Sequence, residues 1–275
     1  MTDATASSNT ALEKKVTLNT LKKHKSDQHK FVTVALYDAP MAHMAELSGV
    51  EVVLVGDSLG MTVLGYDSTI PVTMEHMLYH IEAVARGNKK SLILGDLPFM
   101  TYGTPEQTLD NAAKVLRAGA HVVKVEGGAW LADTIKMLAE RGIPVCAHLG
   151  LTPQSVNKFG GFRVQGRAAD QAKQILKDAV LLEKSGADLL VLECVPSALA
   201  KQITEQLNIP VIGIGAGRET DAQVLVINDI LGLTPHPPKF SKNFLVEAQD
   251  IPGALKRYVA DVRTGHFPSD EHIFI

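Results

Sequence analysis

The feature that most constrains the fold is one short unit that recurs along the chain. In each copy a helical pattern ends at Gly or Asn, one or two residues follow, and an apolar run begins. Glycine just past a helix supplies the left-handed residue that ends it, and continuous apolar runs are typical of parallel strands buried on both faces. The clearest copies lead into residues 52–55, 122–125, 145–147, 189–192 and 211–214.

Three further apolar runs, 32–36, 92–95 and 224–228, bring the predicted strands to eight. Strands that alternate with helices predict a parallel α/β architecture, and eight repeats favour a closed (β/α)8 TIM barrel. The connection from residue 214 to residue 224 is too short for a normal crossover helix, so an open doubly wound sheet stays an alternative.

No break in composition indicates a second domain. We therefore expect a disordered tail over residues 1–15 and a single barrel domain over residues 16–275. Residues 243–265 read as a closing helix that is broken at Pro252.

Composition narrows the class of protein. A chain of 275 residues with 45% hydrophobic residues can bury a large core. A formal net charge of −3 gives no sign of a nucleic-acid partner or of binding to an anionic membrane. No run approaches the roughly 20 apolar residues that span a bilayer, and the polar N-terminus does not resemble a secretory signal. Cys146 and Cys194 lie in apolar runs, which indicates buried thiols and a cytoplasmic protein.

Polar side chains follow the predicted strands at the positions where barrel enzymes build their active sites. In a barrel, residues at the carboxyl ends of the strands converge on one pocket. These positions hold Tyr37, Asp38, Asp57, Ser58, Asp96, Lys124, Glu126, His148, Glu193, residues 215–217 and Asp229. Several carboxylates that face one pocket repel one another unless a cation or a bound proton compensates. The set therefore predicts a common site.

Taken singly, these residues also have purely structural explanations. An Asp after a strand is often a turn residue or a helix N-cap, which explains Asp38 and Asp229 at least as well as a function does. Lys124 and Glu126 lie two apart on one strand, so they share a face and could form only an ion pair. His148 alone is best explained as a core histidine with its hydrogen bonds satisfied.

The ligand types favour a hard cation. Carboxylates with few histidines and no Cys cluster indicate Mg²⁺ or a similar ion rather than zinc. An α-keto acid can chelate such an ion, which stabilises the enolate formed when a carboxylate base removes the neighbouring proton. The alternative for Lys124 is a Schiff base, as in metal-free aldolases, and Asp57 and Asp96 argue against it. The residues thus predict a metal-dependent enzyme that enolises a small keto acid.

Two glycine-rich segments are less specific. Residues 213–217 (GIGAG) follow a strand, where they either cradle a phosphate or allow a close approach of backbone or substrate. Residues 152–162 form a loop after the fifth predicted strand that could act as a lid or face a cofactor.

Longer motifs make the chain resemble the ketopantoate hydroxymethyltransferase family. They run in order from about residue 17 to the C-terminal helix, and motifs of this length are highly specific. They comprise residues 55–61 (VGDSLGM), 64–69, 71–73, 96–99 (DLPF), 123–128 (VKVEGG), 148–155 (HLGLTPQS), 160–167, 193–196 (ECVP), 213–217 and 238–240 (PKF).

The resemblance implies a Mg²⁺-dependent barrel of the phosphoenolpyruvate/pyruvate type that assembles as a homodecamer of two pentameric rings. It implies transfer of a one-carbon unit from 5,10-methylenetetrahydrofolate to 3-methyl-2-oxobutanoate, giving 2-dehydropantoate in the first committed step of pantothenate and coenzyme A synthesis. By motif, Asp57 and Asp96 bind the metal and Glu126 is a further ligand, directly or through water. Glu193 is the base that takes the C3 proton. The implied substrate-binding residues are Asp57, Ser58, Asp96, Lys124 and His148.

Two rival functions stay open. One is a related metal-dependent C–C lyase or mutase on the same barrel, which differs in its electrophile. The other is a non-catalytic barrel that binds metal or phosphate, and the charge of Glu193 argues against it because that charge serves no purpose in phosphate binding.

Overall fold

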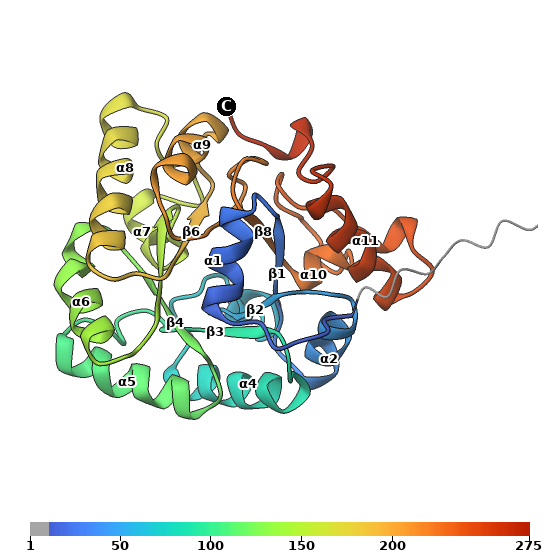
Figure 1. Ribbon diagram of the computed structural model, residues 1–275, viewed down its shortest axis with the longest axis horizontal. Coiled ribbons are helices and arrows are strands. Elements are labelled where there is room, and N and C mark those ends of the chain that lie inside the picture. The colour runs from blue at the N-terminus through green and yellow to red at the C-terminus, as the bar shows by residue number, and fades with distance from the viewer. Residues whose placement is uncertain (1–10) are drawn as a thin grey trace, which may run out of the picture.

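The computed structural model describes residues 11–275, and its strands form a closed parallel barrel in the order β1 to β8 (Figure 1). The ring closes through β1 and β8, with Phe31 opposite Ala222 and Ala35 opposite Val226. This confirms the predicted barrel and rules out the open sheet. The strands are β1 (Phe31–Ala35), β2 (Val52–Val55), β3 (Leu92–Asp96), β4 (Val122–Glu126), β5 (Val145–Gly150), β6 (Leu189–Glu193), β7 (Val211–Ile214) and β8 (Ala222–Val226).

Helices connect the strands and cover the outside of the barrel (Figure 1). They are α1 (Leu18–Ser26), α2 (Ala39–Leu47), α3 (Leu59–Thr62), α4 (Met74–Gly87), α5 (Pro105–Arg117), α6 (Ala132–Glu140), α7 (Val156–Phe159), α8 (Ala169–Lys184), α9 (Ser197–Gln206), α10 (Ile227–Ile230) and α11 (Ile251–Arg263). Four single 3₁₀ turns, η1 (Ala129–Leu131), η2 (Pro153–Ser155), η3 (Leu245–Glu247) and η4 (Asp270–His272), complete the set. None of the helices in residues 11–275 has both the length and the apolar character that crossing a bilayer requires.

Local sequence signals explain where several helices begin. The side chain of Asp38 accepts a hydrogen bond from the backbone N–H of Met41 at 2.8 Å, so Asp38 is the N-cap of α2, as its structural explanation predicted. The closing helix predicted over residues 243–265 spans only Ile251–Arg263, so Pro252 lies at its start rather than at a break within it. Helix α11 begins at Ile251 and holds the proline in its first turn, where the missing N–H would have no helical partner.

The connection between β7 and β8 is the short one that left the topology open. Residues 215–221 contain no helix, and β8 begins at Ala222, two residues before the predicted start. Gln223 reaches back from β8 and donates from Nε2 to the carbonyl of Gly217 at 2.9 Å and to Thr220 Oγ1 at 2.8 Å. These bonds hold a tight turn, which replaces the usual crossover helix.

Alternate residues of each strand point into the barrel. The interior cluster contains Phe31, Ala35, Val52, Leu54, Leu92, Leu94, Val122, Cys146, Leu189, Val191, Ile212, Ile214, Ala222 and Val224. Helix α1 closes the amino-terminal end, where Lys25 Nζ contacts Asp221 Oδ2 at 2.7 Å. Cys146 and Cys194 are both buried and free, as predicted.

The chain ahead of α1 is described from residue 11. Leu12 packs against the interior cluster, and its carbonyl accepts a hydrogen bond from Lys90 Nζ at 2.6 Å. Of the tail predicted over residues 1–15, residues 1–10 lie outside the described part of the chain.

The same alternation carries the polar residues inward at the carboxyl ends. Lys124 and Glu126 follow Val122 on the inward face of β4, and His148 follows Cys146 on β5. The strand register sets Asp96 opposite Lys124 and Glu126 opposite His148, while Glu193 lies opposite Gly150. The barrel therefore gathers side chains that are far apart in sequence.

Candidate active site

Three buried carboxylates form the centre of the site. Asp57, just after β2, Asp96 at the end of β3, and Glu126 at the end of β4 each offer an oxygen within 4.8 Å of the others. These three residues are called the acidic cluster below. Burial, and then the charges of Asp96 and Glu126, raise the pKa of Asp57 well above its usual value. The pocket therefore holds more negative charge than its own cations balance.

Lys124 lies among these carboxylates. Its Nζ donates to Asp96 Oδ2 at 2.7 Å and to Glu126 Oε1 at 3.0 Å. Burial alone would lower the pKa of Lys124, but the neighbouring carboxylates outweigh it and raise that pKa well above its usual value. A lysine held in its charged form is a poor Schiff-base nucleophile, so the geometry argues against the aldolase-like alternative.

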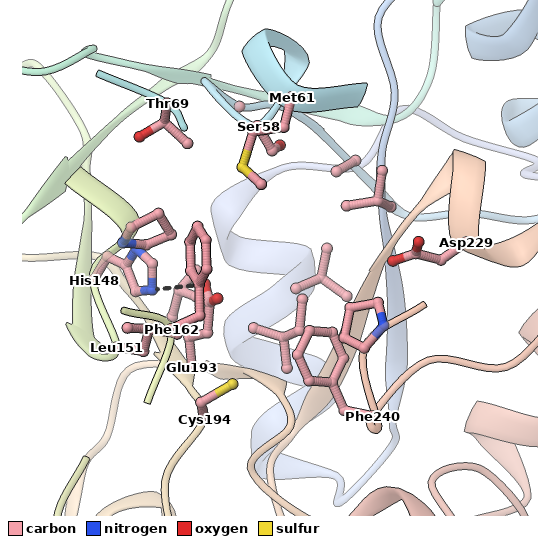
Figure 2. Close-up of a pocket in the computed structure, with 18 of the residues that line it drawn as sticks. Ser58, Met61, Thr69, His148, Leu151, Phe162, Glu193, Cys194, Asp229 and Phe240 are labelled. Carbon is pink, nitrogen blue, oxygen red and sulfur yellow. Dashed lines mark ion pairs between the residues drawn. The ribbon is translucent and has the colours of Figure 1, made fainter. Parts of the chain in front are cut away.

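His148 links the acidic cluster to Glu193. Its Nδ1 lies 3.0 Å from Glu126 Oε1, and its Nε2 lies 3.4 Å from Glu193 Oε2 without hydrogen-bond geometry (Figure 2). Burial and Lys124 would lower the pKa of His148, but Glu126 and Glu193 raise it to about 9. The side chain of Glu193 is 16% exposed, whereas that of Glu126 is 2% exposed. Glu193 is therefore the carboxylate of this pair that opens to the cavity.

Ser58 follows Asp57 at the cavity wall. Tyr37 OH and Ser58 Oγ lie 2.8 Å apart, and burial raises the pKa of Tyr37 to about 12, so the phenol keeps its proton. Either hydroxyl of the pair can donate to the other. The structure thus places at one cavity the seven residues that the resemblance implied for the site: Asp57, Ser58, Asp96, Lys124, Glu126, His148 and Glu193.

Gln154 was not predicted as a site residue. It lies in η2, within the loop that the sequence indicated as a lid or cofactor-facing segment, and it is buried. Its Nε2 donates to Asp57 Oδ2 at 2.8 Å, and its backbone N–H donates to Glu126 Oε2 at 3.2 Å. Tyr102 OH in turn donates to Gln154 Oε1 at 2.5 Å. One loop residue therefore bridges two members of the acidic cluster.

The cavity around these groups has a volume of about 530 Å³. Figure 2 shows His148 and Glu193 on one side of it and Asp229 and Phe240 on the other. Asp229 belongs to α10 and is buried. It is not a helix cap, so that explanation fails for Asp229.

The glycines of residues 213–217 serve packing. A Cβ on Gly215, whose φ is +58°, would lie 2.9 Å from Phe240 Cδ1 and 3.0 Å from Phe274 Cε2. The close-approach alternative is therefore favoured over a phosphate cradle, because side chains fill the space beside this glycine.

The acidic cluster meets the requirements of a site for a hard divalent cation. Its donors are carboxylate oxygens at or just after the carboxyl ends of three neighbouring strands, and Asp96 Oδ1 is buried without a hydrogen-bond partner in the described part of the chain. A buried acceptor without a partner is costly, and a cation satisfies it. The fold and the cluster together define a TIM barrel with a candidate site for a divalent cation at the carboxyl ends of its strands.

Comparison with known proteins narrows this class. The family model for ketopantoate hydroxymethyltransferase matches residues 15–270, so the chain belongs to that family. It is 73% identical over 265 residues to the 3-methyl-2-oxobutanoate hydroxymethyltransferase of Saccharophagus degradans, covering 96% of this chain and 98% of the relative. It is 57% identical over 262 residues to the enzyme of that name from Escherichia coli O139:H28, covering 95% and 99%.

Solved structures of low sequence identity share the fold. A phosphonopyruvate hydrolase in complex with oxalate and Mg²⁺ aligns with a TM-score of 0.60 at 14% identity, covering 94% of this chain and 93% of that one. A 2,3-dimethylmalate lyase of the phosphoenolpyruvate mutase/isocitrate lyase superfamily aligns with a TM-score of 0.57 at 14% identity, covering 94% and 99%.

Proposed function

We propose that this enzyme transfers a hydroxymethyl unit from 5,10-methylenetetrahydrofolate to 3-methyl-2-oxobutanoate, giving 2-dehydropantoate on the route to pantothenate and coenzyme A. The observation that carries the proposal is the position of Glu193, which opens to the cavity while its neighbour His148 contacts Glu126. His148 lies between this base and the acidic cluster, so the base and the cluster line the same part of the cavity. The names of the close relatives support the reaction and its acceptor.

We propose Mg²⁺ as the cation, held by Asp57 and Asp96 with Glu126 as a further ligand, directly or through water. When bound, the ion would supply Lewis-acid stabilisation of the negative charge that develops on the keto oxygen. The related phosphonopyruvate hydrolase holds Mg²⁺ and oxalate, a small anion with adjacent carboxylates, which supports this choice.

Lys124 and Ser58 are proposed to hold the keto acid. An ammonium group has three N–H donors, and Lys124 uses two on Asp96 and Glu126. The third is available to the substrate carboxylate or to its keto oxygen. Ser58 Oγ, positioned by Tyr37, offers a further donor at the same wall, and His148 lines the pocket beside them.

Glu193 is proposed to remove the proton from C3. In this account the proton passes to a Glu193 carboxylate oxygen, and the electron pair of the broken C–H bond moves toward the keto oxygen. C3 then forms a bond to the one-carbon unit, and both C–N bonds that held this unit to the donor break. Water supplies the hydroxyl oxygen, and tetrahydrofolate leaves with the proton taken from C3 and one proton of water on its two nitrogens. His148 orients Glu193 from the side of the acidic cluster.

Label transfer tests the whole reaction. The protein with Mg²⁺, 3-methyl-2-oxobutanoate and methylene-¹³C-labelled donor should give a ¹³C-labelled hydroxymethyl signal by NMR, and EDTA should abolish that signal. Exchange of the C3 proton without label transfer would favour the rival lyase or mutase. If neither proton exchange nor label transfer is observed, the proposed function is wrong.

Two further features are proposed, the first from the resemblance and the second from the two buried, free cysteines. These are a homodecameric assembly and a cytoplasmic location. Light scattering of the purified protein tests the first, and fractionation of the source cells tests the second.

A further inference from the structure

The cavity is larger than a five-carbon keto acid requires. Pockets of about 300–1,000 Å³ hold drug-sized ligands, and this cavity has about 530 Å³. A keto acid between the acidic cluster and Glu193 would occupy only the side that holds His148 (Figure 2). The opposite side, lined by Asp229, Thr234, Phe240 and Phe274, is called the far half below.

Asp229 is a buried charged group of the far half. The residue is 6% exposed, and its Oδ1 accepts a hydrogen bond from Thr234 Oγ1 at 2.5 Å. Burial raises the pKa of Asp229, and the bond from Thr234 is the one opposing influence within the described part of the chain. Among residues 11–275 no Lys, Arg or His forms an ion pair with this carboxylate, which Figure 2 shows directed into the cavity. A buried carboxylate in this state favours a ligand that brings N–H donors.

Two aromatic rings line the far half beside Asp229. Phe240 and Phe274 stand against Gly215, where the absence of a side chain lets both rings approach the end of β7. At the exposed rim, Lys239 Nζ lies 5.3 Å from the centroid of Phe274 and donates to the carbonyl of Ile273. The far half thus runs from a buried anion, past aromatic rings, to a cation at the mouth.

We propose that the far half binds the folate donor, with Asp229 accepting hydrogen bonds from the 2-amino group and the adjacent ring N–H of the pterin. This inference rests on the hydroxymethyl transfer proposed above. The two pterin donors lie side by side and match the two oxygens of a carboxylate, as the fork of a guanidinium does. The aromatic rings contact the faces of the pterin and the aminobenzoyl group, and Lys239 meets the glutamate carboxylates.

The positions of Asp229 and Lys239 exclude the reverse orientation of the folate, with its glutamate tail at Asp229 and its pterin at Lys239. An anionic tail placed against Asp229 would leave two buried like charges without compensation, while the donor-rich pterin would lie at a cation. The same argument makes Asp229 a poor contact for the keto acid itself. Its removal should therefore affect the folate and leave the enolisation step intact.

The test is a double-mutant-type cycle, in which Asp229 and the 2-amino group of the ligand are removed singly and together. Tetrahydrofolate and its 2-desamino analogue are titrated by calorimetry into the wild type and into Asp229→Asn, each with Mg²⁺ and 3-methyl-2-oxobutanoate. We expect the Kd of tetrahydrofolate to rise about 10- to 100-fold in the variant, as for a lost hydrogen bond to a charged group. In the wild type, the Kd of the 2-desamino analogue should exceed that of tetrahydrofolate by a similar factor. In the variant, the two ligands should bind with nearly the same Kd.

Two controls separate this inference from the proposed function. Asp229→Asn should keep the wild-type rate of C3 proton exchange, which needs no folate. Asp38→Asn makes the same charge change at the N-cap of α2 and should bind tetrahydrofolate as the wild type does. If the wild type transfers the one-carbon unit but Asp229→Asn has an unchanged Kd for tetrahydrofolate, only the Asp229 assignment is wrong. A wild type inactive in both exchange and transfer would overturn the proposed function as well.

Discussion

The side-chain amide of Gln154 lies 2.8 Å from Asp57 Oδ2 and donates a hydrogen bond to it. The same amide nitrogen donates to the carbonyl of Leu97 at 3.0 Å, so it is anchored to the loop after β3. Asp57 follows β2 and Gln154 follows β5, so this bond joins two loops across the mouth of the barrel. Such bonds behind metal ligands fix the direction of the ligand oxygen.

Gln154→Leu should weaken metal binding. Loss of a partner behind a ligand typically costs 10- to 100-fold in affinity, and we expect about tenfold for Mn²⁺ followed by electron paramagnetic resonance. Gln223→Leu is the matched control, because Gln223 is equally buried and also donates twice from Nε2. It should lower stability and leave metal affinity unchanged. Equal metal affinity in both variants would contradict a positioning role for Gln154.

Asp57→Asn and Asp96→Asn should each reduce Mn²⁺ affinity more than Gln154→Leu does, by over about tenfold, because each removes a ligand charge rather than its support. The keto acid should then bind without dependence on metal. Asp188→Asn, at the opposite end of the barrel beside Lys22, is the control. Unchanged calorimetric titrations in the cluster variants would refute the ligand assignment.

Lys124→Met should destabilise the metal-free protein. It removes the cation from three buried carboxylates, and breaking such a pair costs about 3–5 kcal/mol. Mg²⁺ should raise the stability of this variant more than that of the wild type. In the variant the ion compensates the negative charge that Lys124 no longer balances. Urea unfolding with EDTA and with Mg²⁺ measures both values. Lys23→Met is the control, because it removes only an exposed ion pair with Asp27, and it should change the free energy of unfolding little in either condition.

Tyr258→Phe should lower the free energy of unfolding by about 1–2 kcal/mol, because it leaves two buried carbonyls without their donor. Tyr258 OH on α11 donates to the carbonyl of Thr33 at 3.2 Å and to that of Gln223 at 3.1 Å, across the β1–β8 closure. Tyr79→Phe is the control, since Tyr79 is 70% exposed. Equal urea midpoints for the two variants would show that this hydroxyl does not stabilise the closure.

The main lines of the fold were predictable because parallel strands buried on both faces leave continuous apolar runs. The positions of Asp96, Lys124, His148 and Glu193 followed from the same logic, since each lies on the inward face at or near the carboxyl end of such a run. The pattern of apolar residues predicts these positions because it is contained within each segment and needs no knowledge of distant contacts.

Other features depend on contacts that no single segment encodes. Gln154 lies in a loop, and its contact with Asp57 depends on how two loops meet across the barrel. The early start of β8 depends on bonds from Gln223 to the preceding turn rather than on hydropathy. Asp229 reads as a turn residue or a cap in the sequence, and only the folded structure shows that it is buried at the wall of the cavity.

The most direct test of the account is the exchange of the C3 proton of 3-methyl-2-oxobutanoate in D₂O, followed by proton NMR. The wild type with Mg²⁺ should lose the C3 signal, and EDTA should stop the loss. Glu193→Gln should bind Mg²⁺ and the keto acid as the wild type does, yet exchange at least about 100-fold more slowly, the usual contribution of a general base. Exchange at the wild-type rate in Glu193→Gln, or in the wild type with EDTA, would contradict the account.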